Sequence, residues 1–89
     1  MAWTLAIKKS AAKQLEKLDK PSQKRIIQFL REKIEGTSNP RKLGKALKGH
    51  ADDLWRYRIG DYRLICSLDD HTLTILAVAV GHRKNIYEK

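Results

Sequence analysis

The dipeptide Gly60-Asp61 constrains this chain more than any other feature, because it lies between two segments with strand-like patterns, 53–59 and 62–68. A Gly-Asp pair between two strands is typical of the two-residue turn of a tight β-hairpin, in which glycine supplies the positive φ that the turn requires. A two-residue turn also sets the register of the hairpin, so the pattern predicts which side chains lie opposite each other and on which face.

This register predicts a sheet with two faces of opposite character. Arg58 lies opposite Arg63, and like charges in that position are unfavourable by up to about 1 kcal/mol. Arg56 lies on the same face, two residues before Arg58. The three guanidinium groups could hold a phosphate by forked hydrogen bonds, although the same pattern also fits a solvated basic face. The expected core face holds Trp55, Tyr57, Ile59, Tyr62, Leu64 and Cys66, and the other face holds Arg56, Arg58, Arg63 and Ile65.

The first half of the chain predicts one strand and two helices. Residues 2–9 read as the strand, and Ser10 can cap the helix that follows. Pro21 suits the first turn of the second helix, and Gly36 suits its C-terminal end. The apolar residues at helical spacing are Ala12, Leu15 and Leu18 in the first helix, and Ile26, Ile27, Leu30 and Ile34 in the second.

Residues 36–53 are the most polar and irregular part of the chain, with one helical turn expected around Leu43–Leu47. A third strand pattern follows at 72–80. The expected order is β-α-α-β-β-β, an α+β fold. Its antiparallel sheet ends in a three-strand C-terminal meander and is covered on one face by a helical hairpin.

Charge and composition limit the partners and the compartment. The net charge is +9, and residues 1–50 hold all of the excess, with 13 Lys and Arg against 4 acids, whereas residues 51–89 hold 6 against 6. Such an excess favours polyanionic partners such as nucleic acid. The single cysteine, Cys66, excludes an internal disulfide and fits a reducing compartment. Without a signal-peptide pattern or a long apolar run, we expect a cytoplasmic protein that has no membrane partner.

The C-terminal segment "VAVGHRKNIYEK" adds reactive groups to the arginine face. Gly81 allows a bend after the last strand, and we expect the strand end to bring His82, Arg83 and Tyr87 to the edge of that face. An anion patch with an imidazole and a phenol suits phosphoryl transfer on RNA, where the 2′-OH can attack the adjacent phosphate. This chemistry requires no metal or cofactor, and we expect none.

The segments "LKGHADDLWRYRIGDYRLI" and "VAVGHRKNIY", together with the element order, resemble the RelE/ParE superfamily of bacterial type II toxins. The resemblance covers residues 1–89 as a single RelE-like toxin domain, and its ending is closer to RelE-type mRNA interferases. It implies a ribosome-dependent endonuclease that cleaves A-site codons and inhibits translation. The implied partners are an acidic cognate antitoxin, mRNA and 16S rRNA, with a toxin that is monomeric when free and hetero-oligomeric with its antitoxin.

The resemblance also implies roles for individual residues. Arg63 matches an arginine that contributes to phosphate binding, and Arg83 matches the arginine after the last strand that stabilises the transition state. Tyr87 matches a C-terminal tyrosine that orients the substrate. The expected substrate-binding residues are Arg56, Arg58 and Lys48.

The chain departs from RelE at the positions of Arg56 and Arg58, where RelE has two lysines. One of those lysines is a candidate general base, but an arginine is not deprotonated in a protein. Arg58 can therefore hold the phosphate, and the proton acceptor must be another group. His82 has a suitable intrinsic pKa, and Tyr87 is the other candidate.

Two other functions fit the same sequence. One is a ParE-like inhibitor of DNA gyrase with this fold and no RNase activity. The other is a basic module that binds nucleic acid without catalysis.

Overall fold

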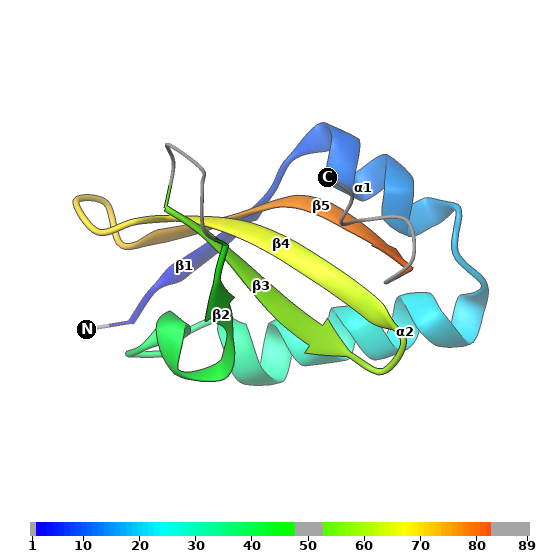
Figure 1. The fold of residues 1–89 in the computed structure, drawn as a ribbon, viewed down its shortest axis with the longest axis horizontal. Coiled ribbons are helices and arrows are strands. Elements are labelled where there is room, and N and C mark those ends of the chain that lie inside the picture. Colours follow the sequence, from blue (N-terminus) through cyan, green and yellow to red (C-terminus); the bar gives the residue numbers. More distant parts are fainter. Residues whose placement is uncertain (1, 48–52, 83–89) are drawn as a thin grey trace.

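The computed structural model describes residues 2–47 and 53–82. Within these residues, five strands form one sheet in the order β1-β5-β4-β3-β2, and two helices pack against it (Figure 1). The predicted α+β class is confirmed. The helices are α1 (Lys9–Glu16) and α2 (Lys20–Phe29), and the strands are β1 (Thr4–Ile7), β2 (Lys45–Ala46), β3 (Leu54–Ile59), β4 (Tyr62–Asp69) and β5 (Thr74–His82).

The predicted antiparallel meander is confirmed in β3, β4 and β5. Each expected pair of the hairpin is present, from Trp55 opposite Cys66 to Ile59 opposite Tyr62. Gly60 has a φ of +61°, which fits the first central position of a type II′ turn. The expectation of a wholly antiparallel sheet is wrong at β1, because this edge strand runs parallel to β5.

The two helices begin differently, because α2 has a side-chain cap and α1 has none. α1 starts at Lys9 and its N-cap residue is Lys8, so the expectation that Ser10 caps this helix is wrong. α2 is capped by Asp19, whose carboxylate accepts hydrogen bonds from the Ser22 amide at 3.2 Å and the Ser22 hydroxyl at 2.8 Å. Pro21 occupies the first turn of α2 as predicted.

The C-terminal end of α2 widens into one π-helical turn, Leu30–Ile34, and Gly36 follows with a φ of +79°. This left-handed residue confirms the predicted helix stop. The buried stripe of the second helix is Ile26, Leu30 and Ile34, whereas Ile27 is 37% exposed and is not a core residue. In α1 the buried residue is Ala11, and the predicted Ala12 is only partly buried.

The core lies between the helices and the predicted aromatic face of the hairpin. Tyr57 is fully buried at its centre, and its hydroxyl donates a 2.6 Å hydrogen bond to the carbonyl oxygen of Pro40. Leu15 of α1 and Leu18, which follows this helix, pack against the core. Its buried members include Ile26, Leu30, Ile34, Tyr57, Ile59, Leu64, Cys66, Ile75 and Val80.

The segment before β3 differs from its prediction. A 3-10 helix occupies Pro40–Leu43, and Lys45–Ala46 then forms β2 on the edge of β3, so the helical turn expected around Leu43–Leu47 is wrong. The reason is Gly44, which lies flat against β3. A Cβ on Gly44 would lie 2.8 Å from both the Arg56 carbonyl oxygen and Tyr57 Cε1.

Candidate phosphate-binding site

Four cations lie next to one another on the sheet face that points away from the core. Lys45 is opposite Arg56, and Arg58 is opposite Arg63, while Arg56 and Arg58 are alternate residues of β3. We call these four residues the basic face. The direct opposition of Arg58 and Arg63 is unfavourable within the folded protein, and a bound polyanion would relieve it.

Arg63 is the buried member of the basic face, with 5% of its surface exposed. Its Nη1 donates hydrogen bonds to the Tyr62 carbonyl at 3.1 Å and, more weakly, to the Gly60 carbonyl at 3.4 Å. Its Nε is buried and has no hydrogen-bond partner in the part of the chain that the structure describes. A buried donor of a charged group without an acceptor is costly, and an anionic oxygen would satisfy it.

Gly81 lies opposite Arg63 on β5. On the basic face, Arg63 is therefore flanked by Arg58 on one side and by a residue without a side chain on the other.

Arg58 is exposed and lines two hollows at the edge of β3. The first has a volume of about 130 Å³ and is lined by Leu43, Gly44, Lys45, Arg56 and Arg58. The second, of about 300 Å³, lies at the hairpin end beside Arg25 of α2. The smaller hollow places three cations around a space suited to a phosphate group, and Lys45 is a member that the sequence analysis missed.

A β-bulge changes the position of His82. Cys66 pairs with Ala77 and Ile65 pairs with Ala79, so Val78 is the extra residue on β5. After the bulge the alternation is reversed, and Val80 and His82 lie on the core face. The His82 ring makes an edge contact with Tyr62, with the ring centroids 5.7 Å apart.

The expected placement of His82 on the arginine face is therefore wrong. The expected bend at Gly81 is also absent, because β5 continues through this residue to His82. The structure brings together Arg56, Arg58 and Arg63, and it places His82 across the sheet from them.

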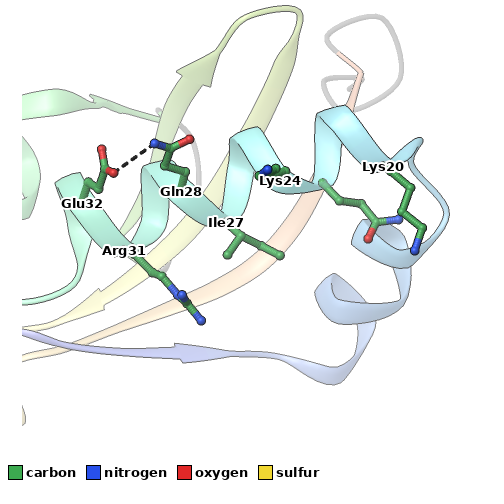
Figure 2. Close-up of a pocket in the computed structure, with 7 residues that line it drawn as sticks. Lys20, Lys24, Ile27, Gln28, Arg31 and Glu32 are labelled. Atoms are coloured by element: carbon green, nitrogen blue, oxygen red, sulfur yellow. Dashed lines mark hydrogen bonds between the residues drawn. The ribbon is translucent and has the colours of Figure 1, made fainter.

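A further hollow of about 640 Å³ lies along the outer side of α2 (Figure 2). Figure 2 shows Ile27 and Arg31 on the same side of the helix, with Lys24 one turn and Lys20 two turns before Ile27. Gln28 donates a 3.0 Å hydrogen bond to Glu32 at one end. With three cations and one acid in its lining, this surface is also basic.

Comparison with known proteins identifies the family. Residues 5–87 match the profile of the ParE toxin of type II toxin–antitoxin systems, parDE. The chain belongs to the RelE/ParE toxin family. The toxin RelG of Mycobacterium tuberculosis is 27% identical over 89 residues, which is the full length of both chains.

Solved structures share the fold of this toxin. A chain of the M. tuberculosis toxin–antitoxin complex RelBE2 superposes with a TM-score of 0.83 at 25% identity, covering 96% of this chain and 95% of that one. The archaeal RelE–RelB complex from Pyrococcus horikoshii gives a TM-score of 0.75 at 32% identity, covering 96% and 99%. The profile carries the ParE name, whereas these relatives carry RelE-type names.

Three of the predicted functional residues of the toxin, Lys48, Arg83 and Tyr87, lie outside the described residues. Among residues 2–47 and 53–82, no group of three or more His, Cys, Asp or Glu side chains could hold a metal ion. Within the same residues, no helix is long and apolar enough to cross a membrane. Cys66 is buried, and burial raises the pKa of its thiol to about 12, so the thiol is poorly suited to nucleophilic chemistry.

Proposed function

We propose that this toxin is a ribosome-dependent mRNA endonuclease that cleaves codons in the A site and so inhibits translation. The observation that carries the proposal is the basic face, in which Arg58 is opposed to Arg63 and the Nε of Arg63 is buried with no hydrogen-bond partner among residues 2–47 and 53–82. These features suit a phosphodiester, which offers several anionic oxygens to groups that are already in place.

The proposed reaction uses the substrate's own nucleophile. The 2′-oxygen forms a bond to the adjacent phosphorus as the bond from phosphorus to the 5′-oxygen breaks, which leaves a 2′,3′-cyclic phosphate and a 5′-hydroxyl. One proton leaves the 2′-OH and one reaches the departing 5′-oxygen. No metal ion or other cofactor is needed in this scheme, because the nucleophile is internal and the charge is stabilised by cations.

Each residue of the site has a proposed role. Arg63 and Arg58 hold the scissile phosphate, and Arg83 stabilises the charge that develops in the transition state. Tyr87 orients the substrate, and the proton acceptor is Tyr87 or His82. The residues proposed to hold the flanking phosphates are Lys45, Arg56 and Lys48.

The same surface chemistry supports the proposed partners. The cations of the basic face suit binding to the phosphates of mRNA and 16S rRNA. So do the three cations that line the hollow beside α2, which are Lys20, Lys24 and Arg31. They equally suit an acidic cognate antitoxin, in line with the toxin–antitoxin complexes among the structural relatives. We propose that the toxin is a cytoplasmic protein that is monomeric when free and hetero-oligomeric with its antitoxin.

Mapping mRNA 5′ ends in cells that express the wild type or Arg83→Ala tests the proposal. We expect breaks in phase with codons for the wild type and none for the variant, which should still bind antitoxin. Intact mRNA with growth inhibition would overturn the proposal.

The ParE name of the matching profile favours one alternative, inhibition of DNA gyrase. In that case the same cells would show DNA damage, and their mRNA would remain intact. Harmless expression without any antitoxin would instead indicate a basic module that only binds nucleic acid.

A further inference from the structure

Arg41 of the 3-10 helix is held on several sides at the end of the sheet farthest from the Gly60-Asp61 turn. Its two terminal nitrogens donate hydrogen bonds to both carboxylate oxygens of Asp70, at 3.0 and 2.8 Å. Its Nη2 also donates to Asp53. The guanidinium carbon lies 5.9 Å from the ring centroid of Trp3 and 5.6 Å from that of Trp55, so both rings contact the cation.

These contacts join segments that are distant in sequence. Asp53 immediately precedes β3, Asp70 lies in the turn between β4 and β5, and Trp3 immediately precedes β1. Asp53 also accepts a 2.6 Å hydrogen bond from the Trp55 indole nitrogen. We call Arg41, Asp53, Asp70, Trp3 and Trp55 the Arg41 clamp.

β2, the strand that follows Arg41, is too short for its own pairing with β3 to fix its position. β2 has two residues, and its pairing consists of Lys45 opposite Arg56 and Ala46 opposite Trp55, followed by one hydrogen bond from the Leu47 amide to the Leu54 carbonyl at 3.0 Å. Pairing of this length is weak in isolation. The position of Lys45 on the basic face therefore depends on how the preceding 3-10 helix is anchored.

We propose that Arg41 is a positioning residue, which holds β2 against β3 through the clamp and so sets Lys45 beside Arg56 for binding RNA phosphate. The assignment of Lys45 to phosphate rests on the proposed function. A lysine cannot replace Arg41, because one ammonium group does not form a two-pronged bond to Asp70 while presenting flat faces to two indole rings.

The first test measures how firmly β2 is held against β3 in the absence of RNA. In the free full-length toxin, Arg41→Lys should speed hydrogen exchange of the Leu47 amide by about tenfold or more, with little change in the global free energy of unfolding. Because Trp3 and Trp55 are the chain's two tryptophans, indole fluorescence should change as well. Arg31→Lys, at an arginine in the π-helical turn that follows α2, is the matched control and should change neither signal.

A second variant covers the case in which Arg41→Lys fails to fold. Asp70→Asn keeps the arginine and Asp53 but weakens the two-pronged contact, so it should speed Leu47 exchange by a smaller factor. Unchanged Leu47 exchange in a folded variant of either kind would overturn the anchoring role.

The second test asks whether Arg41 acts through Lys45. Arg41→Lys should raise the dissociation constant for a single-stranded RNA oligonucleotide by about tenfold, which corresponds to about 1.4 kcal/mol. In a Lys45→Ala background the same change should have no further effect, whereas a general structural role would give additive losses. Additive losses would overturn the proposal.

The two tests separate the possible failures. If the wild type neither binds nor cleaves RNA, the proposed function is wrong, and Leu47 exchange still decides whether Arg41 anchors β2. If RNA cleavage is present but Leu47 exchange is unaffected, the proposed function stands and the positioning role of Arg41 is wrong.

Discussion

Arg58 and Arg63 lie directly opposite each other on neighbouring strands, yet Arg58 is exposed to solvent and Arg63 is buried. The difference comes from their positions in the sheet. β2 pairs with β3 only as far as Arg56, so Arg58 is on an edge, whereas Arg63 lies on β4 between two paired strands. The pair therefore presents one exposed, hydrated cation and one fixed, desolvated cation to a ligand.

This difference predicts unequal losses on substitution. Arg63→Ala should lower RNA cleavage by about 10- to 100-fold, because charge-assisted hydrogen bonds contribute about 1.5–3 kcal/mol. Arg58→Ala should lower it by less than about tenfold, since its interactions are screened by water. Cleavage of RNA by ribosome-bound toxin measures both changes.

Lys13→Ala on α1 is the control for a simple loss of positive charge. Its side chain is exposed and belongs to neither the basic face nor the hollow beside α2, so this variant should keep the cleavage rate at saturating ribosome concentration. Antitoxin binding and the free energy of unfolding show whether each variant is folded. Full activity of a folded Arg63→Ala variant would contradict the assignment of this residue to the scissile phosphate.

The hairpin could be predicted from sequence because a two-residue turn leaves one register, and alternation then assigns every side chain between Trp55 and Cys66. The opposition of Arg58 and Arg63 followed directly. The burial of Arg63 did not, since it depends on the neighbours of β4 and not on the hairpin itself.

The position of His82 could not be predicted for a different reason. The segment "LTILAVAV" is apolar at nearly every position, so its pattern contains no signal for the extra residue at Val78. One bulge reverses the faces of all later residues in the strand. A strand with alternating polar residues would have revealed the reversal.

The sequence did not predict β2 or the position of Lys45, because the local spacing of apolar residues favours a helix whereas the contact with β3 favours a strand. Leu43 and Leu47 have helical spacing, but Gly44 must lie against Tyr57 and the backbone of Arg56. That close approach decides the conformation of the segment. It becomes visible only once β3 is in place.

Gly44→Ala should therefore disturb both stability and the basic face. The new methyl group would meet the Arg56 carbonyl and the Tyr57 ring at 2.8 Å, and a packed backbone cannot yield without moving β2. We expect a loss of about 1–3 kcal/mol in the free energy of unfolding, measured by urea denaturation. We also expect weaker RNA binding.

Gly36→Ala is a control with a similar loss of stability. Nothing lies within 4 Å of its new methyl group, but its φ of +79° makes alanine unfavourable by about 1–2 kcal/mol. This variant should keep RNA binding when folded. Equal losses of RNA binding in both variants would indicate that global stability, and not the position of β2, controls binding.

We expect the protein to lose stability at high pH, because the Cys66 thiol and the Tyr57 phenol are buried in their neutral forms. Burial raises the pKa of Cys66 to about 12 from its ordinary value of 9.0, and burial also raises the pKa of Tyr57 above its ordinary value of 10.0. Folding favours the protonated form of each group. Their contribution to stability is therefore complete below pH 9 and falls as the pH rises toward the folded-state pKa values.

The free energy of unfolding should fall by up to about 1.4 kcal/mol per pH unit for each group, beginning near pH 9. In Cys66→Ala the decline should begin about one unit higher, where Tyr57 of the unfolded chain starts to ionise. Urea denaturation between pH 8 and about pH 11 measures the onset. The same onset in the wild type and in Cys66→Ala would show that the thiol does not contribute.

His82 tests which group accepts the 2′-OH proton. Because its ring lies on the core face against Tyr62, we expect His82→Gln to lower cleavage by only a few-fold and to leave the pH profile unchanged. Tyr87→Phe should instead lower cleavage by about 100-fold or more, as loss of a proton acceptor does. Single-turnover cleavage on programmed ribosomes between pH 5.5 and 8.5 separates the two variants. If His82→Gln removes an acidic limb from the profile, the histidine is the proton acceptor and must reach the phosphate around the end of β5.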